Sequence, residues 1–318
     1  MFVILCTIVC LAVFAIASLA AVCIAEACCR LLPKNVWETG KGSTFFLLRS
    51  LPFWLPLLLT GAFFLPSFLL FEPRQTTETP EPLLIALAIG AAVALIGFCI
   101  RVVYGIGRNC KHTRNWLRTA IKLESRLGNN VYQIENPCSA VVVTGFFNPR
   151  IFIGSDALRV LNADELRAAI AHEVAHTTSF DNLKRLFLCA TRPPKWLIGL
   201  CAAERSWCSA AEIEADAAAL CDGVSALDLG SAIVKIGRLN LYAESSPEGS
   251  HLVPVSEPSA LHARVRSIQQ AVTATRSQSL SARNPLAFWL TAIALTSYLM
   301  MLPQVLLFGH RVIECIVQ

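Results

Sequence analysis

The sequence predicts a mostly α-helical integral membrane protein, with four transmembrane helices and a small α+β domain between the third and the fourth. Apolar residues make up 55% of the 318 residues, charged residues make up only 15%, and the mean hydropathy is +0.56. A soluble domain usually carries about 25% charged residues. The composition therefore excludes a disordered chain and a free cytosolic enzyme, and it requires part of the chain to lie in lipid.

Four apolar stretches are each long enough to cross about 30 Å of hydrocarbon as a helix. They cover residues 1–25, 50–71, 82–100 and 285–308. We interpret the first as a retained span and not as a signal peptide, because no basic residue precedes it and it exceeds the usual length of a signal sequence. Pro52, Pro56 and Pro66 predict kinks in the second.

The predicted organisation has three transmembrane helices in residues 1–104, a folded domain in residues 105–284, and the fourth helix with a short tail in residues 285–318. Nothing between residues 101 and 284 is apolar for long enough, without charges, to form another span.

The net charge of +5 is unevenly distributed and predicts the orientation in the membrane. Basic residues dominate the loop between the first two spans and the segment after the third, whereas the loop between spans two and three is acidic. Basic loops stay on the cytoplasmic side. We therefore expect a multi-pass protein of the cell (inner) membrane with a cytoplasmic domain and both termini outside. The charge indicates orientation, so a nucleic-acid partner is not expected.

The thirteen cysteines are an odd number, and several of them lie inside the long apolar runs. A disulfide-bonded secreted fold is short and carries its cysteines in loops. Most of these cysteines are therefore expected to be reduced and buried.

The domain is predicted to combine strands and helices. Residues 111–127 alternate basic and apolar residues, which suits an amphipathic helix leaving the membrane or an ordinary surface helix. Short β-branched runs between residues 131 and 154 predict two or three strands with tight turns. Asn162 and Glu165 form a helix-capping pattern, which predicts a helix over residues 163–178. Residues 183–203 are apolar but contain four charges and two prolines, so they predict a hairpin that packs on the domain or rests in the membrane interface.

The helix predicted over residues 163–178 carries the sequence His172-Glu173-Val174-Ala175-His176. Two histidines four residues apart lie on the same helix face, and their ring nitrogens can converge on one zinc ion at about 2.0–2.1 Å. Glu173 would reach the open side of the metal. A catalytic zinc needs three protein ligands and one open position, so a third ligand must come from elsewhere.

A second helix is predicted from about residue 205 to 221, and Gly223 after it is the residue that ends it. This helix offers the third ligand. Glu212 and Asp216 share one face of it, whereas Glu214 points elsewhere. A carboxylate from this helix can complete the site, and Asp216 can bind the free ring nitrogen of a liganding histidine.

The chain resembles the BlaR/MecR-type antibiotic-sensor membrane metallopeptidases, which are gluzincins with an HExxH…ExxAD pattern. The matching stretches are residues 144–154, residues 165–176 together with Asp181, and residues 212–216. The resemblance implies a zincin-like fold for the α+β domain, with Zn²⁺ as the cofactor. It also implies that His172, His176 and Glu212 bind the zinc and that Glu173 is the catalytic base. Asp216 would contact one of the metal ligands without binding the metal itself.

The resemblance also shows departures. About ten residues follow the fourth predicted span, so the penicillin-binding sensor domain of that family is missing and a direct β-lactam sensor is not expected. Signal input would then come from a partner, the lipid or the short outer loops. HtpX-type quality-control proteases and prenyl-protein proteases share the site pattern and a later Pro-Ser…Arg-Val element, here Pro258 to Val265, but the HtpX layout has more spans after the zinc domain.

Two classes of function follow from these residues. The first is a membrane zinc endopeptidase, a hydrolase that cleaves a cytosolic repressor, a membrane protein or itself. All the residues that this chemistry needs are present in the sequence, which favours this class. The second is a signalling scaffold that keeps the zinc fold without turnover. The expected partners are a protein substrate and the lipid bilayer, and the sequence leaves the substrate and the oligomeric state open. His251, His262 and Arg264 are candidates to stabilise the oxyanion, and each can equally be a surface residue.

Overall fold

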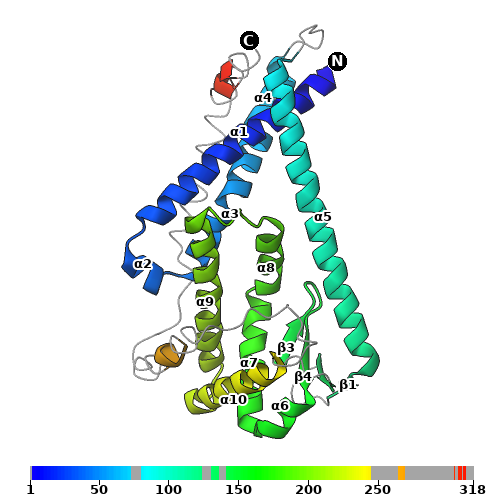
Figure 1. Ribbon diagram of the computed structural model, residues 1–318, viewed down its shortest axis with the longest axis vertical. Coiled ribbons are helices and arrows are strands. Elements are labelled where there is room, and N and C mark those ends of the chain that lie inside the picture. The colour runs from blue at the N-terminus through cyan, green and yellow to red at the C-terminus, as the bar shows by residue number, and fades with distance from the viewer. Residues whose placement is uncertain are drawn as a thin grey trace.

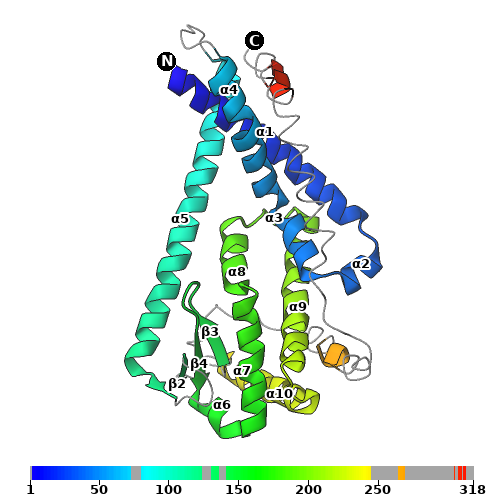
Figure 2. The same cartoon turned by 180° about the vertical axis from the view of Figure 1, so that it is seen from behind.

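The computed structural model describes residues 2–72, 80–123, 130–135, 141–244 and 264–268, together with residues 304, 307–309 and 311–312. The molecule is elongated (Figure 1). Long helices occupy one end, and a small α+β domain occupies the other. Figure 2 shows from behind that two helices of the domain, α8 (Asp181–Ala190) and α9 (Ile198–Cys221), extend to meet the long helices.

Three helices in the described part of the chain are long and apolar enough to cross a membrane. The first is α1 (Phe2–Leu31), and the third is α5 (Pro82–Thr119). The second consists of α3 (Gly42–Leu59), a π-helical turn (Thr60–Phe64) and α4 (Leu65–Phe71), and the short α2 (Lys34–Thr39) precedes it. The fourth predicted span lies almost entirely outside the described residues and stays a prediction.

The second span is interrupted by its π-helical turn, which lies between Pro56 and Pro66. Pro66 is the second residue of α4, and because a proline has no amide hydrogen and its ring crowds the preceding turn, it favours an irregular turn before it. Pro52 and Pro56 lie within α3, which continues as an α-helix through both of them. The span also starts eight residues before the predicted boundary, because the segment from Gly42 to Arg49 is helical as well.

The third span continues into the domain without interruption. α5 runs on to Thr119, so residues 111–119 of the basic stretch, which predicted an amphipathic or surface helix, are the last part of the same helix. No proline lies between Pro82 and Pro137 to end it. The predicted helical stretch to residue 127 was too long, because the chain turns into strand β1 (Ile121–Lys122) after Ala120.

A four-stranded sheet in the order β1-β2-β4-β3 confirms the predicted strands and adds β1. Its other members are β2 (Val131–Ile134), β3 (Val141–Thr144) and β4 (Arg150–Gly154). β2 and β4 are parallel, while β1 and β3 pair antiparallel with their neighbours.

The two faces of the sheet are covered by different helices. Ile151 and Ile153 of β4 pack with Ala169 and Ile170 of α7 (Ala163–Thr178) in one apolar core. On the opposite face the ring of Phe152 lies 5.3 Å from that of Trp116 in α5. The end of the third span is therefore part of the domain's own core.

The remaining helices of the domain are α6 (Ser155–Val160), α8 (Asp181–Ala190), α9 (Ile198–Cys221) and α10 (Ala226–Glu244). The predicted bounds of α7 are confirmed, whereas α9 begins at Ile198 and not near residue 205. The positive φ of Gly223 (87°) follows the end of α9, as its sequence position predicts. The cysteines that the structure describes are free, as expected. The expectation that they are buried is wrong for most of them: among the described cysteines only Cys6 and Cys29 are buried, and six are exposed, including Cys23 and Cys99 on the surfaces of α1 and α5.

The α8–α9 hairpin is fastened to the spans by buried charges. Glu26 of α1 accepts hydrogen bonds from the backbone N–H of Gly199 (2.9 Å) and Leu200 (3.0 Å) at the start of α9. Arg49 of α3 donates to the carbonyl oxygens of Leu188 (3.2 Å) and Thr191 (2.8 Å) at the end of α8. These backbone groups have no partner within their own helices. The predicted hairpin therefore packs on the spans themselves.

Candidate metal centre

The metal centre starts from the well-anchored helix α7. Asn162 accepts hydrogen bonds from the N–H of Asp164 and Glu165, and the Glu165 carboxylate accepts one from the N–H of Asn162 (2.8 Å). Ser231 (2.6 Å) and Lys235 (2.7 Å) of α10 also donate to Glu165. Lys235, Ser231 and the Asn162 amide together lower the pKa of Glu165 to about 2. The predicted capping box is present, and α10 holds it in place.

The structure brings His172, His176 and Glu212 together, although they come from two helices. The Nε2 atoms of the two histidines lie 3.2 Å apart. Glu212 of α9 places Oε2 at 3.5 Å from Nε2 of His172, and Oε1 at 3.6 Å from Nε2 of His176. Four ligands around a tetrahedral metal at 2.0–2.1 Å lie about 3.3–3.4 Å from one another. The three residues can therefore hold a metal ion, and their imidazole and carboxylate donors suit zinc.

Each histidine is also contacted by a carboxylate through Nδ1, the ring nitrogen that does not face Glu212. Asp216 Oδ1 lies 2.8 Å from His172 Nδ1, and Asp181 Oδ2 lies 2.8 Å from His176 Nδ1. Phe180, with φ 55°, lies directly before Asp181, and this left-handed conformation is uncommon for a bulky residue. The turn reverses the chain between α7 and α8 and brings Asp181 beside His176. Both rings therefore direct Nε2 toward Glu212.

The surroundings of the histidines favour positive charge. Burial lowers the pKa of His176, but the hydrogen bonds with Asp181 and Glu212 outweigh it and raise the pKa to about 9. Burial likewise lowers the pKa of His172, and Asp216 and Glu212 raise it overall. Burial raises the pKa of Glu212, but the two histidines and Arg264 bring it well below its usual range. A cation bound here would meet an ionised carboxylate.

Two arginines reach the same carboxylates. Arg264, in the helical segment 264–268, donates to both oxygens of Asp216 at 2.7 and 2.8 Å and lies 3.2 Å from Glu212. Arg185 of α8 donates to Glu212 at 3.2 Å. Of the three residues considered for the oxyanion, the structure thus places Arg264 against carboxylates, while His251 and His262 lie outside the described residues. Sequence reasoning missed Arg185, since nothing in the spacing links it to Glu212, and assigned no role to Asp181.

Glu173 follows the first of the two histidines on α7 and is half-buried. Burial raises the pKa of its carboxyl above the ordinary value, and the two histidines oppose this rise. A carboxyl whose pKa is moved toward neutrality is suited to accept and return a proton. On α9, the Cys208 thiol packs beside the apolar cluster of Phe45 and Trp207, and burial raises its pKa.

Two histidines and a glutamate on neighbouring helices thus form a group that could hold a metal ion. Residues 118–235 match peptidase family M48, and the matched segment contains the sheet, α7, α8, α9 and the first part of α10. No curated protein matches the chain. The family match indicates a metalloprotease, and the three apolar helices indicate that it is associated with a membrane.

Proposed function

We propose that the chain is a zinc-dependent endopeptidase that cleaves a protein substrate at the cytoplasmic face of the membrane, with residues 105–284 as its catalytic domain. The observation that carries the proposal is the convergence of His172, His176 and Glu212 on one point, with ligand atoms within 4.8 Å of one another. In the proposed chemistry, a zinc ion held there supplies Lewis acidity, which polarises a carbonyl oxygen and makes water more acidic.

The chain's own residues have separate tasks in this proposal. Glu173 accepts the proton of the attacking water and returns it to the leaving amine. Asp181 and Asp216 keep the histidine rings oriented. Arg185 and Arg264 hold the Glu212 carboxylate in position.

The position of Glu212 favours substrates that are held close to the membrane. Glu212 lies fourteen residues along α9 from Ile198, which begins the helix beside the spans. At 1.5 Å per residue this is a distance of about 20 Å along the helix. A juxtamembrane segment of a membrane protein, or a cytosolic protein held at the membrane, can reach a site at this depth.

Replacing Glu173 with Gln tests the proposal. Glu173→Gln should lower the cleavage of casein, or self-cleavage, by at least about a hundredfold, because it removes the proton acceptor. The variant should still bind one zinc per chain, measured by elemental analysis of purified protein. Glu135→Gln, which changes an exposed carboxyl, should cleave like the wild type. Proteolysis by Glu173→Gln at the wild-type rate would remove the proposed role of this residue.

Chelation tests the metal independently. Removing the metal with a chelator should abolish cleavage, and added zinc should restore it, because the three ligand residues alone supply no Lewis acid. A protein that binds zinc but cleaves nothing would support the second candidate, a membrane scaffold that keeps the zinc fold without turnover.

The biological role is proposed from resemblance alone. A BlaR/MecR-type role would be the cleavage of a cytosolic repressor in signal transduction, and an HtpX-type or prenyl-protease-type role would be the quality control or processing of membrane proteins. Comparing the proteins of cells that express the wild type or Glu173→Gln separates these roles. The substrate is the protein that disappears only in cells with the wild type.

A further inference from the structure

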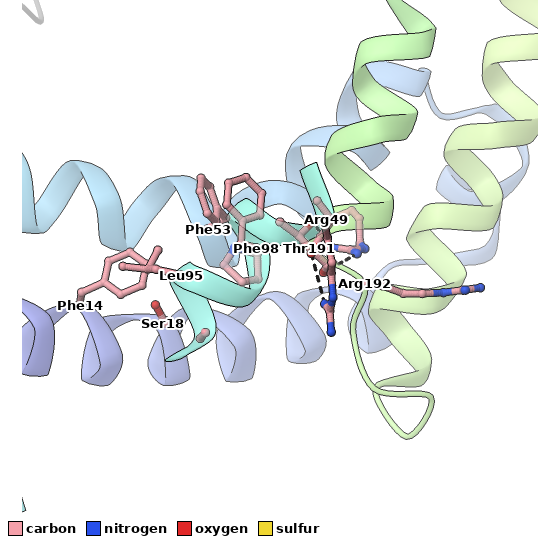
Figure 3. Close-up of a pocket in the computed structure, with 12 residues that line it drawn as sticks. Phe14, Ser18, Arg49, Phe53, Leu95, Phe98, Thr191 and Arg192 are labelled. Carbon is pink, nitrogen blue, oxygen red and sulfur yellow. Dashed lines mark hydrogen bonds between the residues drawn. The ribbon is translucent and has the colours of Figure 1, made fainter. Parts of the chain in front are cut away.

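A cavity of about 240 Å³ lies where the three candidate spans meet the α8–α9 hairpin (Figure 3). Side chains of all three spans form its apolar part. They are Phe14 from α1, Phe53 from α3, and Leu95 and Phe98 from α5. The cavity is open to the surroundings and is lined by helices that are each apolar enough to lie in lipid.

The other end of this cavity is basic. Arg49, Arg101 and Arg192 line it, together with Thr191. Arg49 is buried and already bound to the end of α8 and to Glu204, 3.1 Å away. Arg192 extends away from the cavity in Figure 3. Arg101 is exposed, and its contact with described residues is a single hydrogen bond to the carbonyl oxygen of Ala190 (3.3 Å). A guanidinium has five N–H donors, so Arg101 can bind an anion as well.

Arg101 also lies at the right depth for a lipid headgroup. It is the first charged residue after the apolar run of residues 82–100. The end of such a run marks the boundary of the hydrocarbon layer, where phosphate groups begin. The apolar part of the cavity then faces the acyl chains and its basic end faces the phosphates.

Ser18 of α1 adds a polar group in the apolar part of the cavity. Its hydroxyl oxygen is buried and has no hydrogen-bond partner among the residues that the structure describes. A buried polar group is normally paired. An ester oxygen of a lipid would provide the missing acceptor.

We propose that this cavity binds an anionic phospholipid of the surrounding membrane. Its phosphate would contact Arg101, one acyl chain would pass between Phe14, Phe53 and Leu95, and an ester oxygen would accept a hydrogen bond from Ser18. The cavity is smaller than the roughly 300–1,000 Å³ of pockets that enclose a whole ligand. It therefore takes part of one chain and leaves the rest of the lipid in the bilayer.

Lipid retention by the full-length protein tests this site without using peptidase activity. The protein is reconstituted with equal amounts of dioleoyl-phosphatidylglycerol and dioleoyl-phosphatidylcholine, extracted in mild detergent, and analysed by native mass spectrometry. We expect one phosphatidylglycerol per chain, retained about tenfold over phosphatidylcholine. Arg101→Gln should remove this preference, because a charge-assisted hydrogen bond accounts for about a tenfold difference.

Arg108→Gln is the matched control, because Arg108 is an exposed arginine on the same helix, beyond the cavity. It should keep the preference. Ser18→Ala, a change that a helix tolerates, should lower retention severalfold with the preference for the anionic lipid unchanged. Equal retention of the two lipids by the wild type would overturn the proposal, and so would an equal effect of Arg101→Gln and Arg108→Gln. A bound free fatty acid in place of the phospholipid would also overturn it.

Discussion

Asp181 and Asp216 determine where the two metal-site histidines point. Each carboxylate lies 2.8 Å from the Nδ1 atom of its histidine, so Nε2 is left to face the other ligands. The two carboxylates come from α8 and α9, so the ring orientations depend on how these helices pack against α7.

Asp181→Asn should weaken zinc binding by about 10- to 100-fold, because the supporting hydrogen bond becomes weaker and the ring is held less firmly. Competition with a chromophoric chelator measures the affinity. Asp156→Asn, which alters an exposed aspartate on α6, should leave the affinity unchanged. An Asp181→Asn variant with wild-type affinity would show that the His176 ring is held by other contacts.

Glu165 makes the stability of the domain depend on pH. Its pKa is about 2 in the folded protein and near 4.5 when unfolded, so its contribution is complete above about pH 4.5 and is lost as the pH falls through 2. Glu165→Gln should cost about 2 kcal/mol at pH 7, the usual value of hydrogen bonds to a charged group. Thermal unfolding at several pH values should show that the difference in stability between the wild type and Glu165→Gln decreases toward pH 2. A difference that stays constant with pH would contradict the role of the Glu165 charge. Glu135→Gln should be as stable as the wild type at each pH.

Which side chains share a helix face could be predicted from sequence because helical periodicity is local, whereas the choice of Glu212 as the third ligand came from the resemblance. The spacing of His172 and His176 places both on one face, and that of Glu212 and Asp216 does the same on α9. The structure brings these two faces together. The contacts of Asp181, Arg185 and Arg264 could not be predicted, since they depend on the reversal at Phe180 and on packing between segments far apart in the chain.

The start of α9 could not be predicted from the local sequence. The sequence before Ile198 contains no side chain of its own that caps the helix, and the structure finds none at Leu197. The cap is supplied by Glu26, which is more than 170 residues away in the chain. Local signals therefore indicated the middle and end of α9, but not its first two turns. The capping box of α7 is local, and its bounds were predicted correctly.

Glu26→Ala should destabilise the junction between α1 and α9 by about 1–2 kcal/mol, the usual cost of losing a helix cap. The unfolding midpoint in detergent and the rate of proteolysis between residues 191 and 198 both report this change. Glu81→Ala is the control, because Glu81 directly precedes α5 but, unlike Glu26, makes no capping hydrogen bond with its side chain. Equal effects of the two substitutions would mean that Glu26 does not fasten the hairpin.

At the scale of the whole molecule, several contacts join the α8–α9 hairpin to the spans. Three of them are made by charged side chains: Glu26 holds the start of α9, Arg49 holds the end of α8, and Glu214 accepts a hydrogen bond from the N–H of Gly42 (2.8 Å) at the start of α3. Since α9 also carries Glu212, these contacts link the spans to an element of the candidate metal centre.

The arrangement of the loops leads to a prediction about topology. α2 lies toward the domain, whereas the start of α5 lies at the far end of the spans (Figure 1). Glu81 directly precedes α5. The basic charge of the α1–α3 loop predicts that the end of the spans where this loop lies is cytoplasmic. The domain, which lies at the same end, is then cytoplasmic as well. A membrane-impermeant maleimide should therefore label Glu81→Cys in intact cells, and should label the exposed Cys110 and Cys221 only after permeabilisation. Cys315→Ser is included in every variant, because the tail is expected to lie outside. Labelling of Cys110 and Cys221 in intact cells, with Glu81→Cys protected, would reverse the orientation and place the proposed peptidase on the outer face.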